Sequence, residues 1–553
     1  MNAMKKILCI VLALVMCVGM LAGCGGGGSI GGSDDGGAIS GGDTSTGGDT
    51  STDGGSDEGT ASTNPEVGTT FEIALTAAWT GFDPLRTNDS ASTYVNAQIY
   101  ETLYRIDPET GAYNPLLAAE LPSFSEDGLT VTVKLREGIT FHDGTPFNSE
   151  AVKHTFMLIK DPEFGSARAS IANSIDSIEC PDEYTVVFHL TYEDGVITAK
   201  FAHTNSAIVS PTAQANQDLM INPVGTGPYK FVSSVSGSEV VLTSNEEYWG
   251  GAPEIKNVKM TIITEESTAI ARMETGEADF MPGLSVEQIS RVEAISGVAV
   301  DTSEAANIYY LALRPESYVN PIMAEPEFRK AIAMAIDKEG FVTYTMEGYA
   351  SVANSVLGPK IYGYSPECED VNIDYDPEGA KAILDAHPGW AEEEIVFLCP
   401  STPAYAKMGE YFQANLLAAG FNVKLESIEW SAWLTESKTE NRFDITLAAW
   451  SNVTRDGSEL MEPNFHSVNG AKRILFPADV AAEIDGYIEA SKMTSDEATR
   501  KDNLQKVNAL LQENAYIQPI YNGTNIFCYN ELYTGVTRDV SGVFYVVDFG
   551  YAE

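Results

Sequence analysis

Two neighbouring side chains, His142 and Asp143, could transfer protons or hold a metal ion. Either role needs a nucleophile or further ligands at a mechanistic spacing, and the surrounding residues supply none. We therefore predict a turn at Asp143 and Gly144 that presents a surface imidazole. After residue 66 the chain also holds no HExxH, GxSxG or P-loop spacing, so the sequence predicts no enzyme.

An alternating acidic run could form a calcium loop: Asp370, Asn372, Asp374 and Asp376. Such a loop requires a glycine where this chain has Tyr375, and a bidentate glutamate where it has Lys381. The pattern favours instead a helix that begins at Pro377, with Asp376 as its N-cap. The six histidines are scattered along the chain, and we predict neither a metal site nor a cofactor.

A glycine-rich stretch from Asn222 to Phe231 reads NPVGTGPYKF and could cradle a phosphate. Pro228 has no N–H to donate, however, and no GK[ST] follows. The sequence therefore predicts a rigid turn that leads into a strand.

The N-terminal segment from Met1 to Cys24 has the order of a processing signal. Lys5 and Lys6 precede an apolar run from Ile7 to Leu21, which is too short to span a membrane comfortably. The run ends in LAGC, which resembles a bacterial lipobox. We predict that the Cys24 thiol accepts a diacylglyceryl group and anchors the mature chain to the membrane.

The next segment, residues 25–66, consists almost entirely of Gly, Ser, Thr, Asp and Ala, and we predict a disordered tether. The whole chain has 33 basic and 79 acidic residues, a net charge of −46 that disfavours nucleic acid and anionic lipid as partners. Four cysteines follow the tether without CxxC spacing, and we expect small apolar residues, with one disulfide as the open alternative: Cys180, Cys368, Cys399 and Cys528.

The part after the tether is longer than one ordinary hydrophobic core, so we expect at least two lobes. One helix has a clear apolar face, formed by Phe328, Ala331, Ile332, Ala335 and Ile336. The periodicity and the breakers predict strands over Phe71–Leu75, Thr185–Leu190, Val240–Leu242 and through Gly542–Val547, and helices over Ser267–Thr275, Pro326–Lys338, Asp479–Lys492 and Glu497–Glu513.

Five segments in order resemble signatures of one family: LREGITFHDGTPFNSEAV from Leu135, NPVGTGPYKF, NEEYWGGAP from Asn245, GEADF from Gly276 and FRKAIAMAID from Phe328. Together they resemble the family 5 extracellular solute-binding proteins, the dipeptide, oligopeptide and nickel receptors of ABC importers. The resemblance implies an α/β, two-lobed fold of the periplasmic-binding-protein type (class II, cluster C), with a two-strand hinge. It implies a first lobe of residues 67–305 and 529–553, in which 99–221 form an inserted subdomain, and a second lobe of 306–528.

The resemblance also implies which residues bind the ligand. Trp430 and Trp450 match the aromatic wall of the second lobe, and Tyr521 matches a tyrosine on the strand that recrosses to the first lobe. Burial in the core is the alternative for Trp433 and Tyr521. We add Asn452, which follows the wall, and Trp79, which lies in the loop after the first strand, to the predicted ligand contacts. Aromatic walls bury ligand area and tolerate varied side chains.

One position departs from the family pattern. Peptide receptors of this kind hold the free amine of the ligand with an aspartate three residues past the last tryptophan, and this chain has Val453 there. The next acidic residue along the chain is Asp456, which we predict as a ligand contact together with Arg455. Arg455 could instead pair with an acidic group of the solute.

The resemblance implies an extracytoplasmic lipoprotein that captures peptides, closes by a hinge and presents them to a permease. We expect a monomer on the outer face of the cytoplasmic membrane, in a Gram-positive envelope. A receptor for a sugar or a nickel chelate is the alternative within the family. A secreted hydrolase, which would cleave peptides, and a surface scaffold, which would bind no small molecule, are the alternatives outside it.

Overall fold

The computed structural model describes residues 70–107, 110–439 and 442–552. The predicted lipidation of Cys24 and the predicted tether lie outside these residues. The strands are β1 Thr70–Leu75, β2 Tyr104–Ile106, β3 Tyr113–Pro115, β4 Ser123–Phe124, β5 Thr130–Lys134, β6 Ile175–Asp182, β7 Thr185–Leu190, β8 Tyr229–Val235, β9 Glu239–Ser244, β10 Asn257–Ile262, β11 Phe280–Met281, β12 Val298–Leu313, β13 Ser351–Val352, β14 Glu394–Pro400, β15 Asn422–Ile428, β16 Ile445–Ser451, β17 Ile517–Asn530, β18 Tyr533–Thr534 and β19 Gly550–Tyr551. The helices are α2 Ser90–Ile99, α3 Ser149–Lys160, α4 Ile197–Ala202, α5 Pro211–Asn216, α6 Glu266–Thr275, α7 Ile289–Val292, α8 Pro326–Met334, α9 Lys338–Gly340, α10 Pro377–Ala386, α11 Pro403–Ala419, α12 Trp430–Glu436, α13 Gly457–Phe465, α14 Ala478–Lys492 and α15 Glu497–Glu513.

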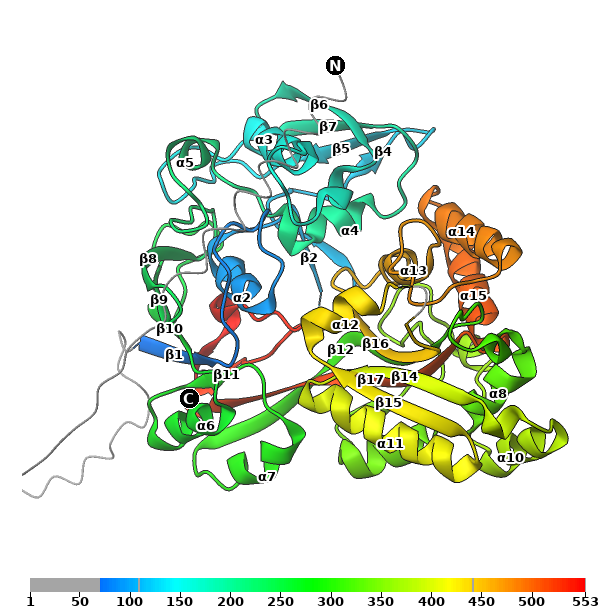
Figure 1. Cartoon of the computed structure of the whole chain (residues 1–553). Helices are drawn as coiled ribbons and strands as arrows, with labels where there is room; N and C mark the ends of the chain where they lie inside the picture. Colours follow the sequence, from blue (N-terminus) through cyan, green and yellow to red (C-terminus); the bar gives the residue numbers. More distant parts are fainter. Residues whose placement is uncertain (1–69, 108–109, 440–441, 553) are drawn as a thin grey trace, which may run out of the picture. The chain divides into compact units, whose positions relative to one another are not determined.

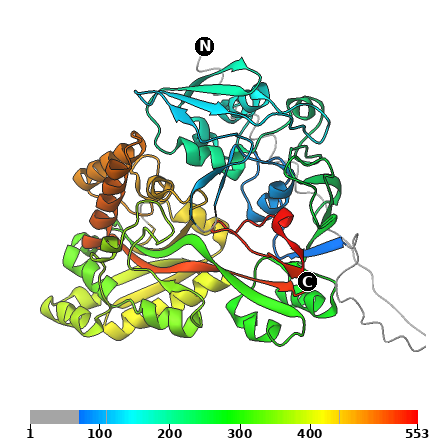
Figure 2. The same ribbon diagram turned by 180° about the vertical axis from the view of Figure 1, so that it is seen from behind.

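One long sheet runs through both lobes in the order β15-β14-β16-β12-β17-β11-β1-β10-β9-β8. The antiparallel strands β12 and β17 cross together from one lobe to the other (Figures 1 and 2). Their register shifts between Glu304 and Ile308, where Gly523 faces the irregularity. A Cβ on Gly523 would lie 2.2 Å from Asn307 Oδ1, so glycine allows the close approach. The predicted two-lobed α/β fold with a two-strand hinge is confirmed.

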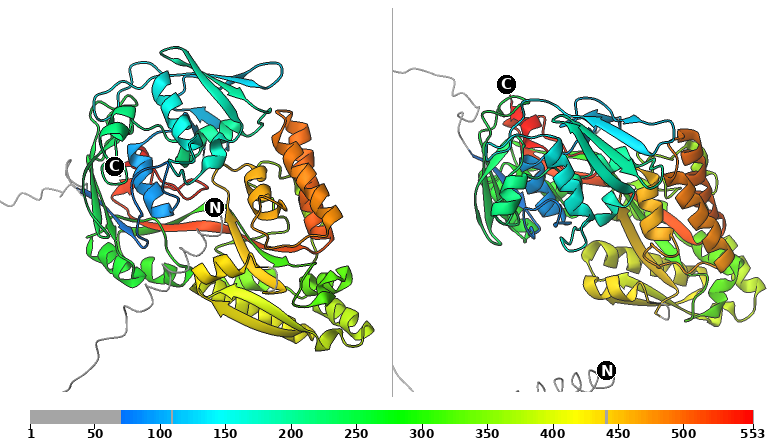
Figure 3. Two further views of the ribbon diagram at one scale, coloured as in Figure 1. Left: turned by 45° about the horizontal axis from the view of Figure 1, so that its top comes forward. Right: turned by 90° about the horizontal axis from the view of Figure 1, so that it is seen from above.

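The inserted segment has its own four-stranded sheet in the order β4-β5-β7-β6. Phe156, Phe188 and Phe201 pack edge-on or tilted against one another in its core. In both views of Figure 3 the paired helices α14 and α15 (orange) lie next to this segment (cyan). The Gly195 N–H donates to the Lys492 carbonyl at 2.7 Å, so the inserted segment contacts the second lobe directly.

The NPVGTGPYKF stretch is a corner pressed against the end of α2. A Cβ on Gly225 would lie 2.1 Å from Ile99 O, and the Gly227 N–H donates to the same carbonyl at 2.8 Å. His142, which we predicted at the surface, bonds through Nε2 to Gly227 O at 2.9 Å. The predicted turn is present, because the Gly144 N–H donates to Phe141 O at 2.8 Å, but the imidazole is half-buried and not at the surface, and burial lowers its pKa to about 4.

A buried carboxylate, Glu101, holds this corner to the aromatic turn that follows β9. It accepts hydrogen bonds from Thr226 Oγ1 at 2.7 Å, Tyr248 OH at 2.7 Å and Trp249 Nε1 at 3.0 Å. Burial raises the pKa of Glu101 from 4.5 to about 7, although the three donors and Arg136 lower it. Between about pH 4.5 and pH 7, the folded protein therefore holds a proton on Glu101 that the unfolded chain has released.

We expect Glu101→Gln to flatten the dependence of stability on pH. Because the pKa of Glu101 is higher in the folded protein than in the unfolded chain, protonation of Glu101 contributes about 3 kcal/mol to stability. This contribution is complete below about pH 4.5 and is lost as the pH rises toward 7. Urea unfolding of the wild type and the variant at pH 5 and pH 8 measures the difference. The exposed Glu126→Gln is the matched control, and an equal pH dependence in all three proteins would refute this role of Glu101.

Several predicted elements agree with the structure. α10 begins at Pro377, and the side chain of Asp376 caps it by accepting from the Gly379 N–H. α15 has the predicted bounds, Glu497–Glu513. The five apolar residues of the predicted Pro326–Lys338 helix are buried. That helix ends early, at Met334, because Asp337 caps a new turn through the Gly340 N–H at 2.8 Å.

The predicted closing strand through Gly542–Val547 is wrong. This segment forms a loop and a short 3-10 turn at Val546–Asp548. The carboxylate of Asp539 accepts from the N–H groups of Ser541 and Val543, both at 2.9 Å, and so replaces strand pairing with a side-chain turn. The four cysteines after residue 70 are free, and three of them are buried. Within the part of the chain that the structure describes, no helix is long and apolar enough to cross a bilayer.

Candidate functional site

The parallel strands of each lobe end together. In the second lobe β14 and β15 pair in parallel up to Pro400 and Ile428, and β14 also pairs in parallel with β16. In the first lobe β1 and β10 end together at Leu75 and Ile262. Open α/β sheets bind ligands outside the carboxyl ends of their strands. The loops that follow these strands are therefore the candidate ligand-binding loops.

The loop of residues 452–456, between β16 and α13, contacts three cavities. Asn452 lines a cavity of about 300 Å³ at the hinge. Val453 lines a cavity of about 60 Å³ beside Arg105 and Tyr545. Thr454 and Asp456 line a third cavity of about 460 Å³ between the inserted segment and the second lobe. We call the first the hinge cavity and the third the lobe-interface cavity.

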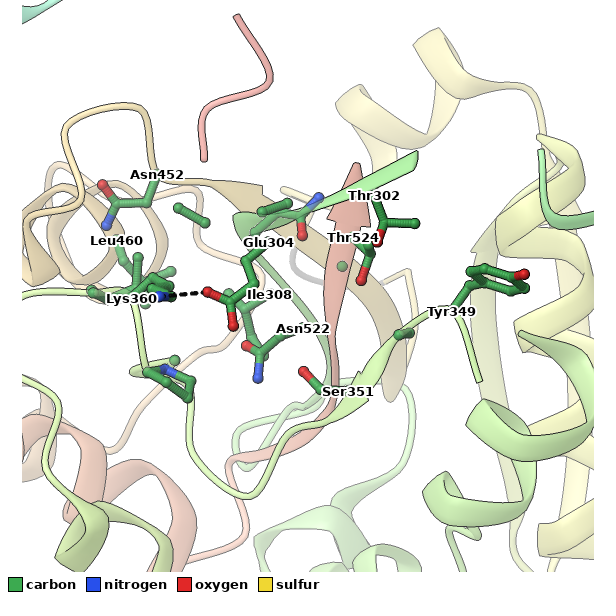
Figure 4. Close-up of a pocket in the computed structure, with 18 of the residues that line it drawn as sticks. Thr302, Glu304, Ile308, Tyr349, Ser351, Lys360, Asn452, Leu460, Asn522 and Thr524 are labelled. Atoms are coloured by element: carbon green, nitrogen blue, oxygen red, sulfur yellow. Dashed lines mark ion pairs between the residues drawn. The ribbon is translucent and has the colours of Figure 1, made fainter. Parts of the chain in front are cut away.

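Backbone and side chains of both crossing strands form the hinge cavity (Figure 4). Glu304 on β12 and Lys360 meet across it at 2.6 Å. Asn452 is buried, its N–H donates to Ala306 O at 2.8 Å, and its Nδ2 donates to Asp456 O at 2.7 Å. The predicted ligand contact Asn452 thus lines the hinge cavity, although its side-chain amide already donates to the backbone of the same loop.

Arg455 connects the two lobes. Its Nε donates to Lys360 O at 3.0 Å in the second lobe, and its Nη1 donates to Asp107 O at 3.1 Å in the inserted segment. Its backbone has φ +61, in the left-handed region that costs a non-glycine residue about 1 kcal/mol or more. A Cβ at Gly111 would lie 2.9 Å from the Arg455 guanidinium carbon, so the contact across the lobes is close. In this structure Arg455 holds the lobes together.

The carboxylate of Asp456 makes structural contacts with both of its oxygens. Its Oδ2 lies 2.6 Å from Nη2 of the buried Arg500, and its Oδ1 accepts from the Ser458 N–H at 3.0 Å as the N-cap of α13. The side chain is 4% exposed. A solute amine would have to compete with a buried guanidinium for this carboxylate.

Trp430 is the most accessible of the predicted aromatic residues. It follows the carboxyl end of β15, begins α12 and is 38% exposed. Its ring stacks on Trp433 at 5.2 Å and lies 5.7 Å from the Tyr405 ring. Trp433 is 1% exposed and donates from Nε1 to Thr446 Oγ1 at 3.0 Å, so it belongs to the core. The core thus fixes Trp430 as a rigid apolar surface.

Trp450 is half-buried and packs against the core of the second lobe, and its backbone pairs with Ile308 of β12. Its Nε1 is buried and has no hydrogen-bond partner among the described residues. An unpaired buried N–H is unfavourable.

Tyr521 and Trp79, the two other predicted aromatic contacts, line none of the three cavities, and neither do Trp430 and Trp450. Tyr521 is 3% exposed and stacks on Tyr309, with ring centres 4.3 Å apart. Trp79 is half-buried and lies 5.9 Å from the Phe82 ring in the first lobe. The loop that carries Trp79 follows the carboxyl end of β1, as the strand-end rule requires.

The lobe-interface cavity contains polar residues that sequence reasoning missed. Arg168 and His203 come from the inserted segment, and Glu459 comes from α13 of the second lobe. No motif links residues so far apart in the chain, and only the lobe contact assembles them. His203 Nε2 lies 3.6 Å from Glu459 Oε1 across the boundary. Within residues 70–107, 110–439 and 442–552, no group of three His, Cys, Asp or Glu side chains could hold a metal ion.

A family model described as bacterial extracellular solute-binding proteins, family 5 middle, matches residues 112–472. The glutathione-binding protein GsiB of Pectobacterium atrosepticum is 30% identical over 402 residues, which cover 71% of this chain and 76% of that protein. GsiB of Shigella flexneri is 26% identical over 495 residues, which cover 87% of this chain and 93% of that protein.

Solved structures share the fold. The ABC transporter substrate-binding protein CtaP of Listeria monocytogenes has a TM-score of 0.79 at 21% identity, with 88% of this chain and 100% of that chain covered. A dipeptide-binding protein of a Pseudoalteromonas species in complex with Met-Leu has a TM-score of 0.74 at 23% identity, with the same coverage.

Proposed function

Because the chain belongs to family 5 of the bacterial extracellular solute-binding proteins, we propose that it captures peptides and delivers them to the permease of an ABC importer. The relatives that support this are named as glutathione-binding and dipeptide-binding proteins. They are binding proteins, and we propose that this chain likewise binds its solute without cleaving it.

The observation that carries the proposal is the position of the loop of residues 452–456. It follows a strand end in the second lobe, contacts three cavities and reaches the first lobe through Arg455. A solute beside this loop would contact both lobes. Such a solute favours the closed arrangement by its differential contacts, which is how ligand binding drives hinge closure.

Calorimetric titration with a defined panel tests this function. We expect binding of short peptides such as Met-Leu and glutathione, and none of maltose or of nickel with histidine. Binding of the sugar or of the nickel complex alone would replace the peptide proposal with the alternative within the family. Release of free amino acids from the peptides would instead identify a hydrolase.

The remaining features complete the proposal. We propose that lipidated Cys24 and the tether of residues 25–66 hold a monomer at the outer face of the cytoplasmic membrane, in a Gram-positive envelope. The lobe boundaries stay as predicted: residues 67–305 with 529–553, including the inserted 99–221, and residues 306–528. Trp430, Trp450, Asn452, Tyr521 and Trp79 stay the proposed ligand contacts. For Arg455 and Asp456 we propose that any ligand contact requires them to leave their present partners.

A further inference from the structure

The crossing strand β12 is interrupted at residues 305–307, where its pairing with β17 stops before it resumes at Ile308. The backbone groups of Ala306 bond elsewhere at this interruption. The Ala306 N–H donates to Val540 O at 2.7 Å, and Ala306 O accepts from the Asn452 N–H at 2.8 Å. One hinge residue therefore joins the candidate ligand loop of residues 452–456 to a second loop, residues 538–544, which we call the 538–544 loop.

Both ends of the 538–544 loop are anchored in the first lobe. Arg538 Nη2 donates to Tyr94 OH at 2.8 Å, and its Nη1 donates to Pro282 O. At the other end, Phe544 is buried in the first-lobe core, and its carbonyl accepts from Gln98 Nε2 at 2.9 Å. The two ends of the loop therefore move with the first lobe.

The middle of the loop reaches the second lobe. Val540 is 7% exposed and is buried in the same hydrophobic cluster as Ile308 and Leu460, which is the core of the second lobe beside the hinge. Val536 and Phe544, on either side of it, belong instead to the core of the first lobe. The loop thus places one apolar side chain in the core of the opposite lobe.

The loop also bonds to the other crossing strand. On β17, Asn525 Nδ2 donates to Asp539 O at 3.0 Å and to Ser303 Oγ of β12 at 3.3 Å. Together with the bond from Ala306, this contact joins the loop to both strands of the hinge. The hinge therefore contains a third segment of chain besides β12 and β17.

Side chains within the loop close its turn. Arg538 Nε donates to Gly542 O at 2.7 Å, and the carboxylate of Asp539 accepts from the Val543 N–H at 2.9 Å. Gly542 has φ +84, a conformation that glycine adopts without strain. Because these bonds hold the turn, Val540 cannot stay in the second lobe while both ends of the loop follow the first lobe away.

We propose that the 538–544 loop is a third hinge element, and that Val540 is the positioning residue through which it holds the two lobes together. The proposal rests on the proposed function and deepens it, because it names what regulates closure at the same site. When the lobes separate, Val540 must leave the apolar cluster of the second lobe. Exposing an apolar side chain to water is unfavourable, so the loop favours the arrangement in which the lobes are in contact.

Single-molecule energy transfer between dyes on the two lobes tests the proposal. Glu126 in the inserted segment and Glu378 on α10, both exposed, are each replaced by azidophenylalanine for coupling of the dyes, so the native cysteines stay. Val540→Ala should lower the ratio of molecules with the lobes together to molecules with the lobes apart by about tenfold, because two buried methyl groups are lost. This fall should occur without ligand and at every concentration of Met-Leu, since the loop acts on the lobe equilibrium itself.

Val536→Ala is the matched control. Val536 is 6% exposed and belongs to the first-lobe core, so the variant loses the same two methyl groups without touching the second lobe. Its lobe ratio should stay within about twofold of that of the wild type. Asn525→Ala, which removes the bonds to Asp539 and Ser303, should lower the ratio at least threefold and decides the question if Val540→Ala does not fold.

The lobe ratio separates this proposal from the proposed function. An unchanged ratio in Val540→Ala, or an equal fall in Val536→Ala, would overturn the hinge element while the peptide function stands. A lower ratio in ligand-free Val540→Ala, together with no response of the wild type to Met-Leu, would support the hinge element and contradict the peptide function.

Discussion

Replacing Asp456 with alanine is expected to destabilise the protein by about 4 kcal/mol, because the change leaves the buried Arg500 without its counter-ion. Arg500 is 6% exposed, and its Nε donates to Ser491 O at 2.9 Å, so the guanidinium cannot simply turn to water. The variant also loses the N-cap of α13, which contributes about 1 kcal/mol. Chemical denaturation of wild type and variant at pH 7 measures the change.

Asp496→Ala is the matched control, because Asp496 caps α15 through the Thr499 N–H at 2.8 Å and is exposed. It should lose only the capping contribution of about 1 kcal/mol. If the two variants lose the same free energy of unfolding, the ion pair with Arg500 contributes nothing. In that case Asp456 is free to serve as a ligand contact, as we first predicted.

Replacing Trp430 with alanine is expected to weaken the binding of an apolar dipeptide such as Met-Leu by about thirtyfold, which corresponds to about 2 kcal/mol. The indole is held in place by Trp433 and Tyr405, so it offers contact area without losing conformational freedom on binding. Because Trp430 packs on Trp433 and Tyr405 but is 38% exposed, the free energy of unfolding should fall by about 2 kcal/mol and the variant should remain folded. Calorimetric titration and denaturation of the same samples separate the two effects.

Leu434→Ala is the control for this prediction. Leu434 lies one turn further along α12 and is 36% exposed, so the substitution removes a similar kind of surface from the same helix. The affinity of the Leu434→Ala variant for Met-Leu should stay within twofold of that of the wild type. An unchanged affinity in Trp430→Ala, or an equal loss in Leu434→Ala, would contradict a ligand wall at Trp430.

Local signals in the sequence predicted the elements that depend on local chemistry. Asp376 before Pro377 predicted the start of α10, and the apolar spacing from Phe328 predicted a buried helix face. The same reasoning placed a closing strand at Gly542–Val547, where the side chain of Asp539 forms a turn instead. A hydrophobic run alone does not show where its backbone hydrogen bonds go.

The sequence located the candidate site only in part. It selected Trp430 and the loop of residues 452–456, both of which follow strand ends. It did not show that the carboxylate of Asp456 is already paired with Arg500, because this ion pair depends on how α13 and α15 pack. Arg168, His203 and Glu459 had no signal in the sequence, since they meet only where the inserted segment contacts the second lobe.

The most direct test of peptide capture is native mass spectrometry of gently purified protein. Closure over a solute through contacts with both lobes slows its release, so some of the protein should retain its ligand. We predict added masses that equal those of short peptides, and their replacement when excess Met-Leu is added. An added mass that matches a sugar or a nickel complex, or a protein that remains unliganded in excess Met-Leu, would contradict the proposed function.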